Sequence, residues 1–346
     1  MLHSWIEEGG ARVEQFERER TQSQGGFHEL RGHGRPDVFE LVTEQILGRL
    51  STGVVPWQSP SLARVGMPRN FHSGRAYQGI NVFLLGAHQF QSPHFLTFLQ
   101  AQELGGRVRR GEHGMFIVKL GTWRRDGQET QDAADQSKET ASSPRRFLKV
   151  YTVFNACQIE GIEFPPPPTP PAYSPSVLAD RARQIVDGMP HPPLIHEGRK
   201  AFPHYVPPLD TVEMPSRETF QAEWRYYITL FHELGHATGH ASRLSRPTLI
   251  ENRGIHVVGS EKKIYCQEEL VAEMTAAFLG AYAGIVEDAQ ENSAAYLKGW
   301  MDVLRVHDHR TWLIKAAAEA QRAANYVLGT AASPTGESEP ALSTPP

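Results

Sequence analysis

The most informative segment of this 346-residue chain is Thr219-Phe-Gln-Ala-Glu-Trp-Arg-Tyr-Tyr-Ile-Thr-Leu-Phe-His-Glu-Leu-Gly-His-Ala-Thr-Gly-His240. Its apolar residues recur with helical spacing, so we predict one helix over 219–240. Residues four apart lie on one face of a helix, and His232 and His236 therefore present two imidazoles together. Such a pair, with Glu233 beside the first histidine, is typical of a zinc site. We predict His232 and His236 as metal ligands and Glu233 as the general base.

A catalytic zinc needs a third protein ligand and an open position for water. His240 continues the series, but it lies about 12 Å from His232 along the helix axis at a rise of 1.5 Å per residue. The next apolar helix, predicted over 267–279, carries Glu269 and Glu273 on one face. Because a bare buried carboxylate is costly, a metal and its histidines would stabilise this pair.

We assign Glu269 as the third ligand and Glu273 as the acceptor of a hydrogen bond from a ligand histidine, with the reverse assignment left open. Glu268 is expected to point away and to be exposed. Small residues on this helix would allow close packing against the first one, and Gly235 would let another strand or a substrate approach closely. Zn²⁺ is the expected metal, and Mn²⁺ is an alternative.

Bulk composition indicates a globular chain with a typical hydrophobic content. Hydrophobic residues make up 40% and charged residues 21%, and the formal net charge is −4. The two cysteines, Cys157 and Cys266, are far apart, which excludes a disulfide framework. We see neither a membrane span nor a signal peptide, so we expect a cytoplasmic protein with no membrane partner.

Organisation along the chain predicts an α+β protein of two domains. A helix should begin after Asp37 as N-cap, another short helix should cover 95–105, and strands should cover 115–120 and 149–154. The Pro-rich run at 164–175 should act as a stiff spacer. We predict an N-terminal extension at 1–35, a small α+β domain at 36–163, a mainly helical domain at 176–328 and a disordered tail at 329–346. Residues 125–145 are interpreted as a hairpin insert.

Positive charge is concentrated in the N-terminal half. Nine basic residues lie between Arg64 and Arg125 against two acidic ones, in a chain that is negative as a whole. Aromatic residues lie among them. Basic groups follow a phosphate backbone and aromatic faces stack on unpaired bases, so this pattern favours single-stranded nucleic acid. Phe83 and Phe98 are expected in the core in any case.

Several motifs, in the same order, resemble ArdC-type antirestriction proteins. The N-terminal motifs are Pro56-Trp57, Arg69-Asn-Phe-His-Ser-Gly-Arg-Ala-Tyr-Gln-Gly-Ile-Asn81 and Gly105-Gly-Arg-Val-Arg-Arg-Gly-Glu-His-Gly114. They are similar to the domain that such proteins share with TraC-type primases. The C-terminal motifs are His232–His240, Arg243-Leu-Ser-Arg246 and Glu268-Glu-Leu-Val-Ala-Glu273, and they resemble that family's zincin-like metallopeptidase domain.

The resemblance implies binding of single-stranded DNA (ssDNA) by the first domain, on a mobile element whose DNA is protected from restriction. Candidate DNA contacts in the matched motifs are Trp57, Arg69, Asn70, Arg75, Tyr77 and Asn81. The main hypothesis is therefore an ssDNA-binding antirestriction-type protein with a zinc-dependent peptidase domain that hydrolyses an unknown protein or peptide. Two alternatives stay open: a non-catalytic DNA-shielding protein with a structural metal, and a regulatory peptidase that cleaves a repressor.

Overall fold

The computed structural model describes residues 37–123, 129–130, 145–167, 173–250, 260–285, 294–306 and 311–330. The predicted extension at 1–35 lies outside these ranges, as do nearly all of the predicted insert at 125–145 and of the predicted tail at 329–346. Among the described residues, no helix has the length and apolar character that a membrane crossing requires.

A long antiparallel hairpin organises the N-terminal half. β4 (Met115–Trp123) pairs with β6 (Arg145–Asn155) along its whole length, which confirms the strands predicted here. The sheet has the order β1-β2-β6-β4-β5, and β1 pairs parallel with β2 while the other pairs are antiparallel. The other strands of this half are β1 (Arg69–Asn70), β2 (His94–Thr97) and β5 (Glu129–Thr130), with a separate ribbon of β3 (Arg107–Val108) and β7 (Ile159–Glu160).

The first described helix, α2 (Val38–Ser51), begins as the sequence predicts. The side chain of Asp37 accepts a hydrogen bond from the backbone N–H of Phe39 at 3.0 Å, which satisfies a donor that the first turn leaves open. The apolar face of this helix then packs into the core through Val42, Ile46 and Leu50.

The helix predicted over 95–105 is wrong at its start. Phe95 and Leu96 pair with β6 as part of β2, and α5 covers only Phe98–Glu103. A capping box at Thr97 marks the switch from strand to helix. Its hydroxyl accepts from the N–H of Gln100 at 3.3 Å, and the Gln100 side chain accepts from the N–H of Thr97 at 3.0 Å.

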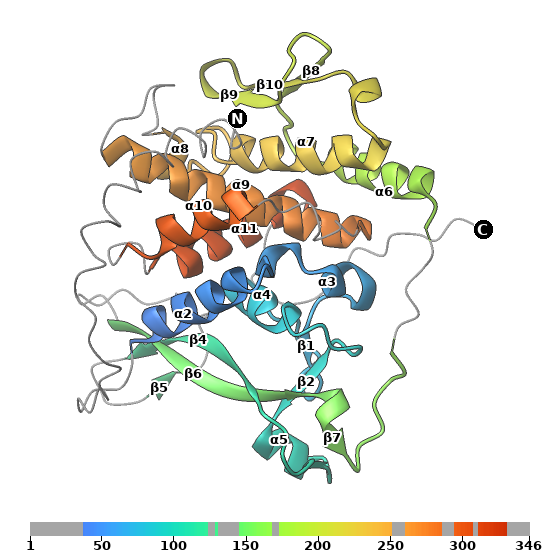
Figure 1. Cartoon of the computed structure of the whole chain (residues 1–346), viewed down its shortest axis with the longest axis vertical. Coiled ribbons are helices and arrows are strands. Elements are labelled where there is room, and N and C mark those ends of the chain that lie inside the picture. Colours follow the sequence, from blue (N-terminus) through green and yellow to red (C-terminus); the bar gives the residue numbers. More distant parts are fainter. Residues whose placement is uncertain are drawn as a thin grey trace.

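The C-terminal half is mainly helical. Its two central helices, α7 (Glu223–Ala237) and α9 (Ser260–Ala283), pack against each other, and a small sheet of order β8-β10-β9 lies above α7 (Figure 1). The strands of this sheet are β8 (Leu194–Glu197), β9 (His204–Val206) and β10 (Thr211–Met214). The other described helices are α3 (Pro60–Val65), α4 (Ile80–Gly86), α6 (Pro175–Asp187), α8 (Pro247–Ile250), α10 (Ala294–Leu304) and α11 (Trp312–Val327).

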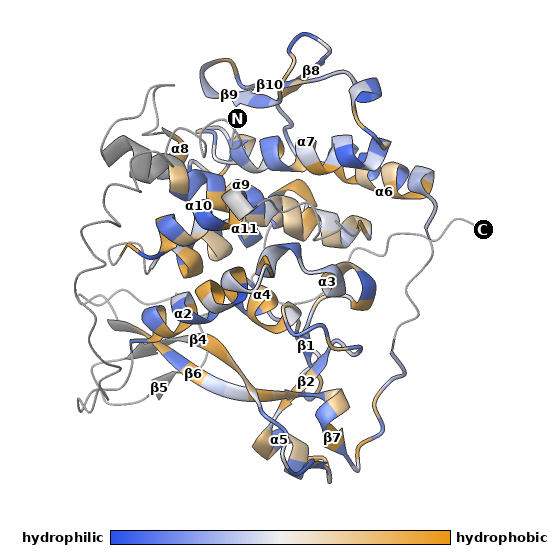
Figure 2. Cartoon of the chain, viewed as in Figure 1, coloured by the Kyte–Doolittle hydropathy of each residue, from blue (hydrophilic) through white to orange (hydrophobic). Residues whose placement is uncertain are grey.

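One hydrophobic core runs through both halves. The helices α2, α3 and α4 form a middle layer (Figure 1). One side of this layer covers the large sheet, and its other side packs against α9, α10 and α11. The rings of Phe83 and Phe278 lie 4.7 Å apart, and Trp57 meets Trp300 edge to face at 5.9 Å. Hydrophobic residues are abundant in these middle layers, whereas the small sheet carries many hydrophilic ones (Figure 2). The segment predicted as a spacer therefore connects two parts that share their core.

Candidate metal centre

The helix that carries the predicted site, α7, is shorter than the sequence indicates. It begins at Glu223 and ends at Ala237, whereas we predicted 219–240. A 3₁₀ turn at Arg217–Thr219 precedes it. The chain turns away after Ala237, and a Cβ atom at Gly239 would lie 2.9 Å from the guanidinium of Arg246. His240 consequently leaves the helix, and its Nδ1 lies 2.8 Å from the hydroxyl of Ser242.

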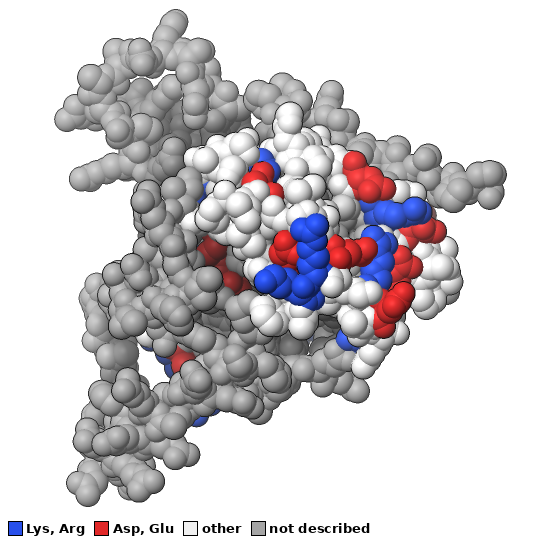
Figure 3. All heavy atoms as spheres, turned by 90° about the horizontal axis from the view of Figure 1, so that it is seen from above, with Lys and Arg blue, Asp and Glu red and all other residues white. Residues whose placement is uncertain are grey.

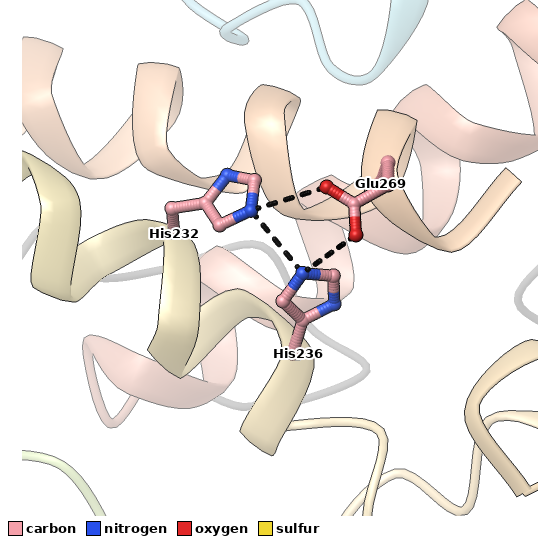
Figure 4. A group of neighbouring side chains, drawn as sticks. All are labelled: His232, His236 and Glu269. Carbon is pink, nitrogen blue, oxygen red and sulfur yellow. Dashed lines mark hydrogen bonds and ion pairs between the residues drawn. The ribbon is translucent and has the colours of Figure 1, made fainter. Parts of the chain in front are cut away.

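His232, His236 and Glu269 converge from two helices, as Figure 4 shows. The two Nε2 atoms are 3.2 Å apart. Nε2 of His232 lies 3.4 Å from Oε2 of Glu269, and Nε2 of His236 lies 3.4 Å from Oε1 of the same carboxylate. All three ligand atoms therefore lie within 4.8 Å of one another.

Close contact between α7 and α9 makes this convergence possible. Gly235 faces Ala272, and a Cβ atom at Gly235 would lie 3.0 Å from the Cα atom of Ala272 and 3.2 Å from Cβ of Thr275. The helices can therefore approach so closely that Glu269, one turn before this contact, reaches the imidazoles. The small residues noted in the sequence serve this packing.

The donor set fits a divalent metal ion. Two imidazoles and one carboxylate are the protein ligands found in one class of catalytic zinc site, and imidazole and carboxylate also suit manganese. A tetrahedral zinc ion with bonds of about 2.0–2.1 Å separates its ligand atoms by about 3.3 Å. The two Nε2 atoms, 3.2 Å apart, have that separation, and each of them lies 3.4 Å from a different oxygen of Glu269.

Glu268 is the residue that sequence reasoning placed wrongly. It is buried, with 2% of its surface exposed, and its Oε1 lies 3.3 Å from Nδ1 of His236. The carboxylate beside a histidine ring that we expected from Glu273 thus comes, for His236, from Glu268. Neighbouring residues of a helix point in different directions, so helical spacing predicted that Glu268 faces away from the site if Glu269 faces it. In the structure both reach the ring of His236, Glu268 at Nδ1 and Glu269 at Nε2. Arg246, 22 residues before Glu268 in the sequence, was the one signal that a buried carboxylate has a partner here.

Glu233 and Glu273 lie close to the three converging side chains. Glu233 is buried, with 6% exposed, directly beside His232 on α7. Glu273 is half-buried on α9, and burial raises the pKa of its carboxyl group while the charge of His232 lowers it. Its predicted role as a hydrogen-bond acceptor for a ligand histidine stays a prediction.

Electrostatics favour positive charge between the converging groups. Burial alone would lower the pKa of His236, but the carboxylates of Glu269 and Glu268 raise that pKa well above its ordinary value. Burial likewise opposes ionisation of Glu269, and the charges and hydrogen bonds of His236 and His232 nevertheless lower its pKa. The negative charge of these buried carboxylates can be balanced either by protons on the imidazoles or by a divalent cation.

Comparison with known proteins finds two family models that match successive parts of the chain. Residues 36–154 match the family model for the N-terminal domain of anti-restriction factor ArdC, and residues 184–319 match the model for a zincin-like metallopeptidase. The crystal structure of metal-free antirestriction protein ArdC from plasmid R388 is 34% identical with a TM-score of 0.64, and the match covers 85% of this chain and 98% of that one. The chain belongs to the ArdC family of antirestriction proteins. The two-domain α+β architecture is thereby confirmed.

A second structure of R388 ArdC and two related sequences extend this comparison. An Mn(II)-bound crystal structure of R388 ArdC matches with a TM-score of 0.63 at 33% identity, over 86% of this chain and 99% of that one. DNA primase TraC of Escherichia coli is 33% identical over 334 residues, which are 91% of this chain but 22% of the primase. The chain therefore spans less than a quarter of that relative. The uncharacterized protein y4eC of Sinorhizobium fredii is 31% identical and matches over 84% of this chain and 91% of its own length.

The predicted DNA contacts of this ArdC-family chain divide by exposure. Trp57 is 1% exposed and packs against Trp300, so a base cannot stack on it in this fold. Asn81 has a structural role, because its side chain donates to the carbonyl of Val118 and accepts from the N–H of the same residue, both at 2.8 Å. Arg75, in contrast, is exposed.

The remaining candidates lie against β2 and the start of α5. Asn70 donates to the side chain of Gln100 at 2.9 Å, Tyr77 is half-buried against Phe95, and Arg69 is half-buried in β1. Phe98, which we expected in the core, is 49% exposed beside Gln100. Its neighbour Leu99 is 67% exposed, and no pattern in the sequence distinguished these two residues from core positions.

The end of the molecule that carries the small sheet has no separate basic surface among its described residues. Seen from the side of the small sheet, the described basic and acidic side chains are interspersed (Figure 3). Elements at that end form mixed ion pairs, among them Arg217 with Glu197 and with Glu223. Such neutralised charge is poorly suited to a phosphate backbone.

Proposed function

We propose that this chain is an antirestriction protein of a mobile element that binds ssDNA and hydrolyses peptide bonds with a divalent metal. The observation that carries the peptidase half is the convergence of His232, His236 and Glu269 beside the buried Glu233. The matching zincin-like family model and the Mn(II)-bound structure of R388 ArdC support it. Zn²⁺ is the proposed metal, with Mn²⁺ as the alternative.

Each residue has a distinct part in the proposed hydrolysis. His232, His236 and Glu269 would hold the metal. When bound, such an ion supplies Lewis-acid chemistry, because it acidifies water and polarises a carbonyl group. Glu233 takes the proton from the attacking water and passes it to the leaving amine. Since Glu233 is buried beside His232, bulk solvent competes little for that proton.

Metal analysis combined with a peptidase assay tests the proposal. The wild-type protein should bind one Zn²⁺ or Mn²⁺ per chain, and His236→Ala should lose it. Glu233→Gln should keep the metal and lose hydrolysis of fluorescein-labelled casein or of a peptide library by a factor of at least about 100. Glu218→Gln, at an exposed position just before the same helix, is the matched control. Metal binding without hydrolysis in the wild type would leave a DNA-shielding protein with a structural metal.

The ssDNA-binding half rests on the N-terminal domain. It is supported by the match to the ArdC N-terminal domain, by the relationship to DNA primase TraC and by exposed basic and apolar side chains such as Arg75 and Phe98. The full-length protein should bind a labelled oligo-dT more tightly than a duplex of equal length. The logarithm of the affinity should fall with that of the salt concentration, by about 0.7 for each phosphate contacted. Equal and weak binding of both DNA forms would count against this half.

A third role, cleavage of a repressor, would need a protein substrate that is cut without DNA. The test is to incubate the Glu233→Gln variant with host extract, with and without oligo-dT, and to identify the proteins that stay bound to it. Retention of one protein in the absence of DNA would favour the regulatory peptidase.

A further inference from the structure

The carboxylate of Glu268 is held from three sides behind the proposed metal centre. Arg246 donates from Nε to its Oε2 at 2.9 Å and from Nη2 to its Oε1, and Thr248 donates its hydroxyl to Oε2. The third contact is the one from Oε1 to Nδ1 of His236, at 3.3 Å. Both side chains of the ion pair are 2% exposed, so the pair is removed from water.

Arg246 is fixed in turn by the end of α7. Its guanidinium donates to the carbonyl of Gly235 at 2.8 Å and to the hydroxyl of Thr238 at 3.0 Å. Gly239 has no side chain where the guanidinium lies, because a Cβ atom there would approach Nη2 to 2.9 Å. The planar guanidinium group of an arginine can donate to both oxygens of a carboxylate. Here it also donates to the carbonyl of Gly235 and the hydroxyl of Thr238. The orientation of Glu268 is thus set by α7 itself.

We propose that the Glu268–Arg246 ion pair positions His236 for metal binding, an inference that rests on the proposed metal centre. A neutral imidazole carries one proton, and the carboxylate at Nδ1 holds that proton there. Nε2 is then left with its lone pair facing His232 and Glu269. Carboxylates placed in this way fix both the tautomer and the ring orientation of a ligand histidine, and they raise its basicity. Arg246 is required because an unpaired carboxylate in this buried place would be costly.

A purely structural ion pair is the competing explanation. Such a pair would join α7 to α9 and leave the metal affinity unchanged once the protein is folded. The chain offers a matched example in Arg243 and Asp210. There Arg243 donates from Nη1 to Oδ2 at 3.0 Å and from Nη2 to Oδ1, and its side chain is 1% exposed. This pair ties the small sheet to the end of α7 and contacts none of the proposed metal ligands.

Metal affinity of the full-length protein distinguishes the two explanations. Zn²⁺ is titrated against a competing chelator, at a temperature well below unfolding, into the wild type, Glu268→Gln and Asp210→Asn. We expect Glu268→Gln to bind Zn²⁺ about 10–100-fold more weakly than the wild type. Asp210→Asn should bind as the wild type does, although both variants lose thermal stability. Asn tolerates the left-handed backbone of this position, where φ is 49°.

A spectroscopic signature and a milder variant complete the test. In the Co²⁺-loaded protein, Glu268→Gln should shift the visible absorption bands and Asp210→Asn should not. If Glu268→Gln does not fold, Thr248→Val removes one hydrogen bond to Glu268 and should weaken Zn²⁺ binding by a smaller factor. If Glu268→Gln or Thr248→Val binds Zn²⁺ as tightly as the wild type, as Asp210→Asn is expected to do, the positioning role is overturned. Failure of the wild type to bind any metal would instead refute the proposed function.

Discussion

At the scale of single residues, exposure decides which motif positions are open to the proposed DNA ligand. Phe98 is 49% exposed, whereas the side chain of Asn81 forms two hydrogen bonds with the backbone of Val118. We predict that Phe98→Ala weakens binding of oligo-dT by about 1–3 kcal/mol, the size of one base stacked on an aromatic ring, and leaves the melting temperature nearly unchanged. Asn81→Ala should instead lower the free energy of unfolding by about 1–3 kcal/mol, because two buried backbone groups lose their partner.

Fluorescence polarisation with labelled oligo-dT and thermal denaturation of the same samples measure both effects. Loss of DNA affinity in folded Asn81→Ala, with Phe98→Ala unaffected, would reverse the assignment. Arg305→Ala, at an exposed position just after α10, controls for a general change of charge.

Residue types and spacing alone predicted that His232, His236 and Glu269 converge, because one helix face and the cost of a buried carboxylate limit the choices. The role of Glu233 stays a prediction. The roles of Glu268 and Trp57 could not be obtained in this way. Glu268 is buried by a loop arginine 22 residues away in the chain. Trp57 is covered by Trp300 of the other half. Both depend on contacts between distant segments, which periodicity does not report.

At the scale of helices, the separation of α7 and α9 sets how closely His232, His236 and Glu269 converge. We predict that Gly235→Ala forces the helices apart, because its Cβ atom would lie 3.0 Å from Cα of Ala272, a backbone atom that cannot turn away. Glu269 would then move from His232 and His236. Overpacking of this kind costs about 1–3 kcal/mol of stability, and Zn²⁺ affinity should fall with it.

Gly48→Ala is the matched control for this helix contact. Gly48 lies within α2, and a Cβ atom there would have nothing within 4 Å. The same substitution should therefore stabilise the protein by about 0.5–1 kcal/mol and leave Zn²⁺ affinity unchanged. Calorimetric titration and denaturant unfolding of both variants measure the contrast. Normal Zn²⁺ affinity in Gly235→Ala would show that the centre tolerates a wider helix spacing.

Helix and strand types were predicted well where a long periodic pattern exists, as in α2, β4 and β6. Boundaries were less accurate. The tertiary pairing of Phe95 and Leu96 with β6 prevailed over the helical pattern at 95–105. The C-terminal end of α7 lies before the predicted one because Arg246 binds the carbonyl groups of Gly235 and His236 at the turn, a contact that helical periodicity cannot show.

At the scale of the whole molecule, the sequence indicated two domains with a spacer, and the structure joins them through one core. The ring of Phe83 on α4 lies 4.7 Å from that of Phe278 on α9, and both side chains are fully buried. Gly79, just before α4, also donates its N–H to the side chain of Gln321 on α11 at 3.2 Å. A change in the C-terminal half should therefore affect the stability of the large sheet in the N-terminal half.

We predict that Phe278→Ala destabilises both halves together. Removal of a buried phenylalanine costs about 3–5 kcal/mol, and a shared core distributes that loss over every element packed on it. Hydrogen exchange should show the same fall in opening free energy for peptides from β4 and from α11. Phe98→Ala, at the half-exposed position, should change neither. If peptides of α11 exchange faster while those of β4 keep their protection, the halves open independently and the shared core does not couple them.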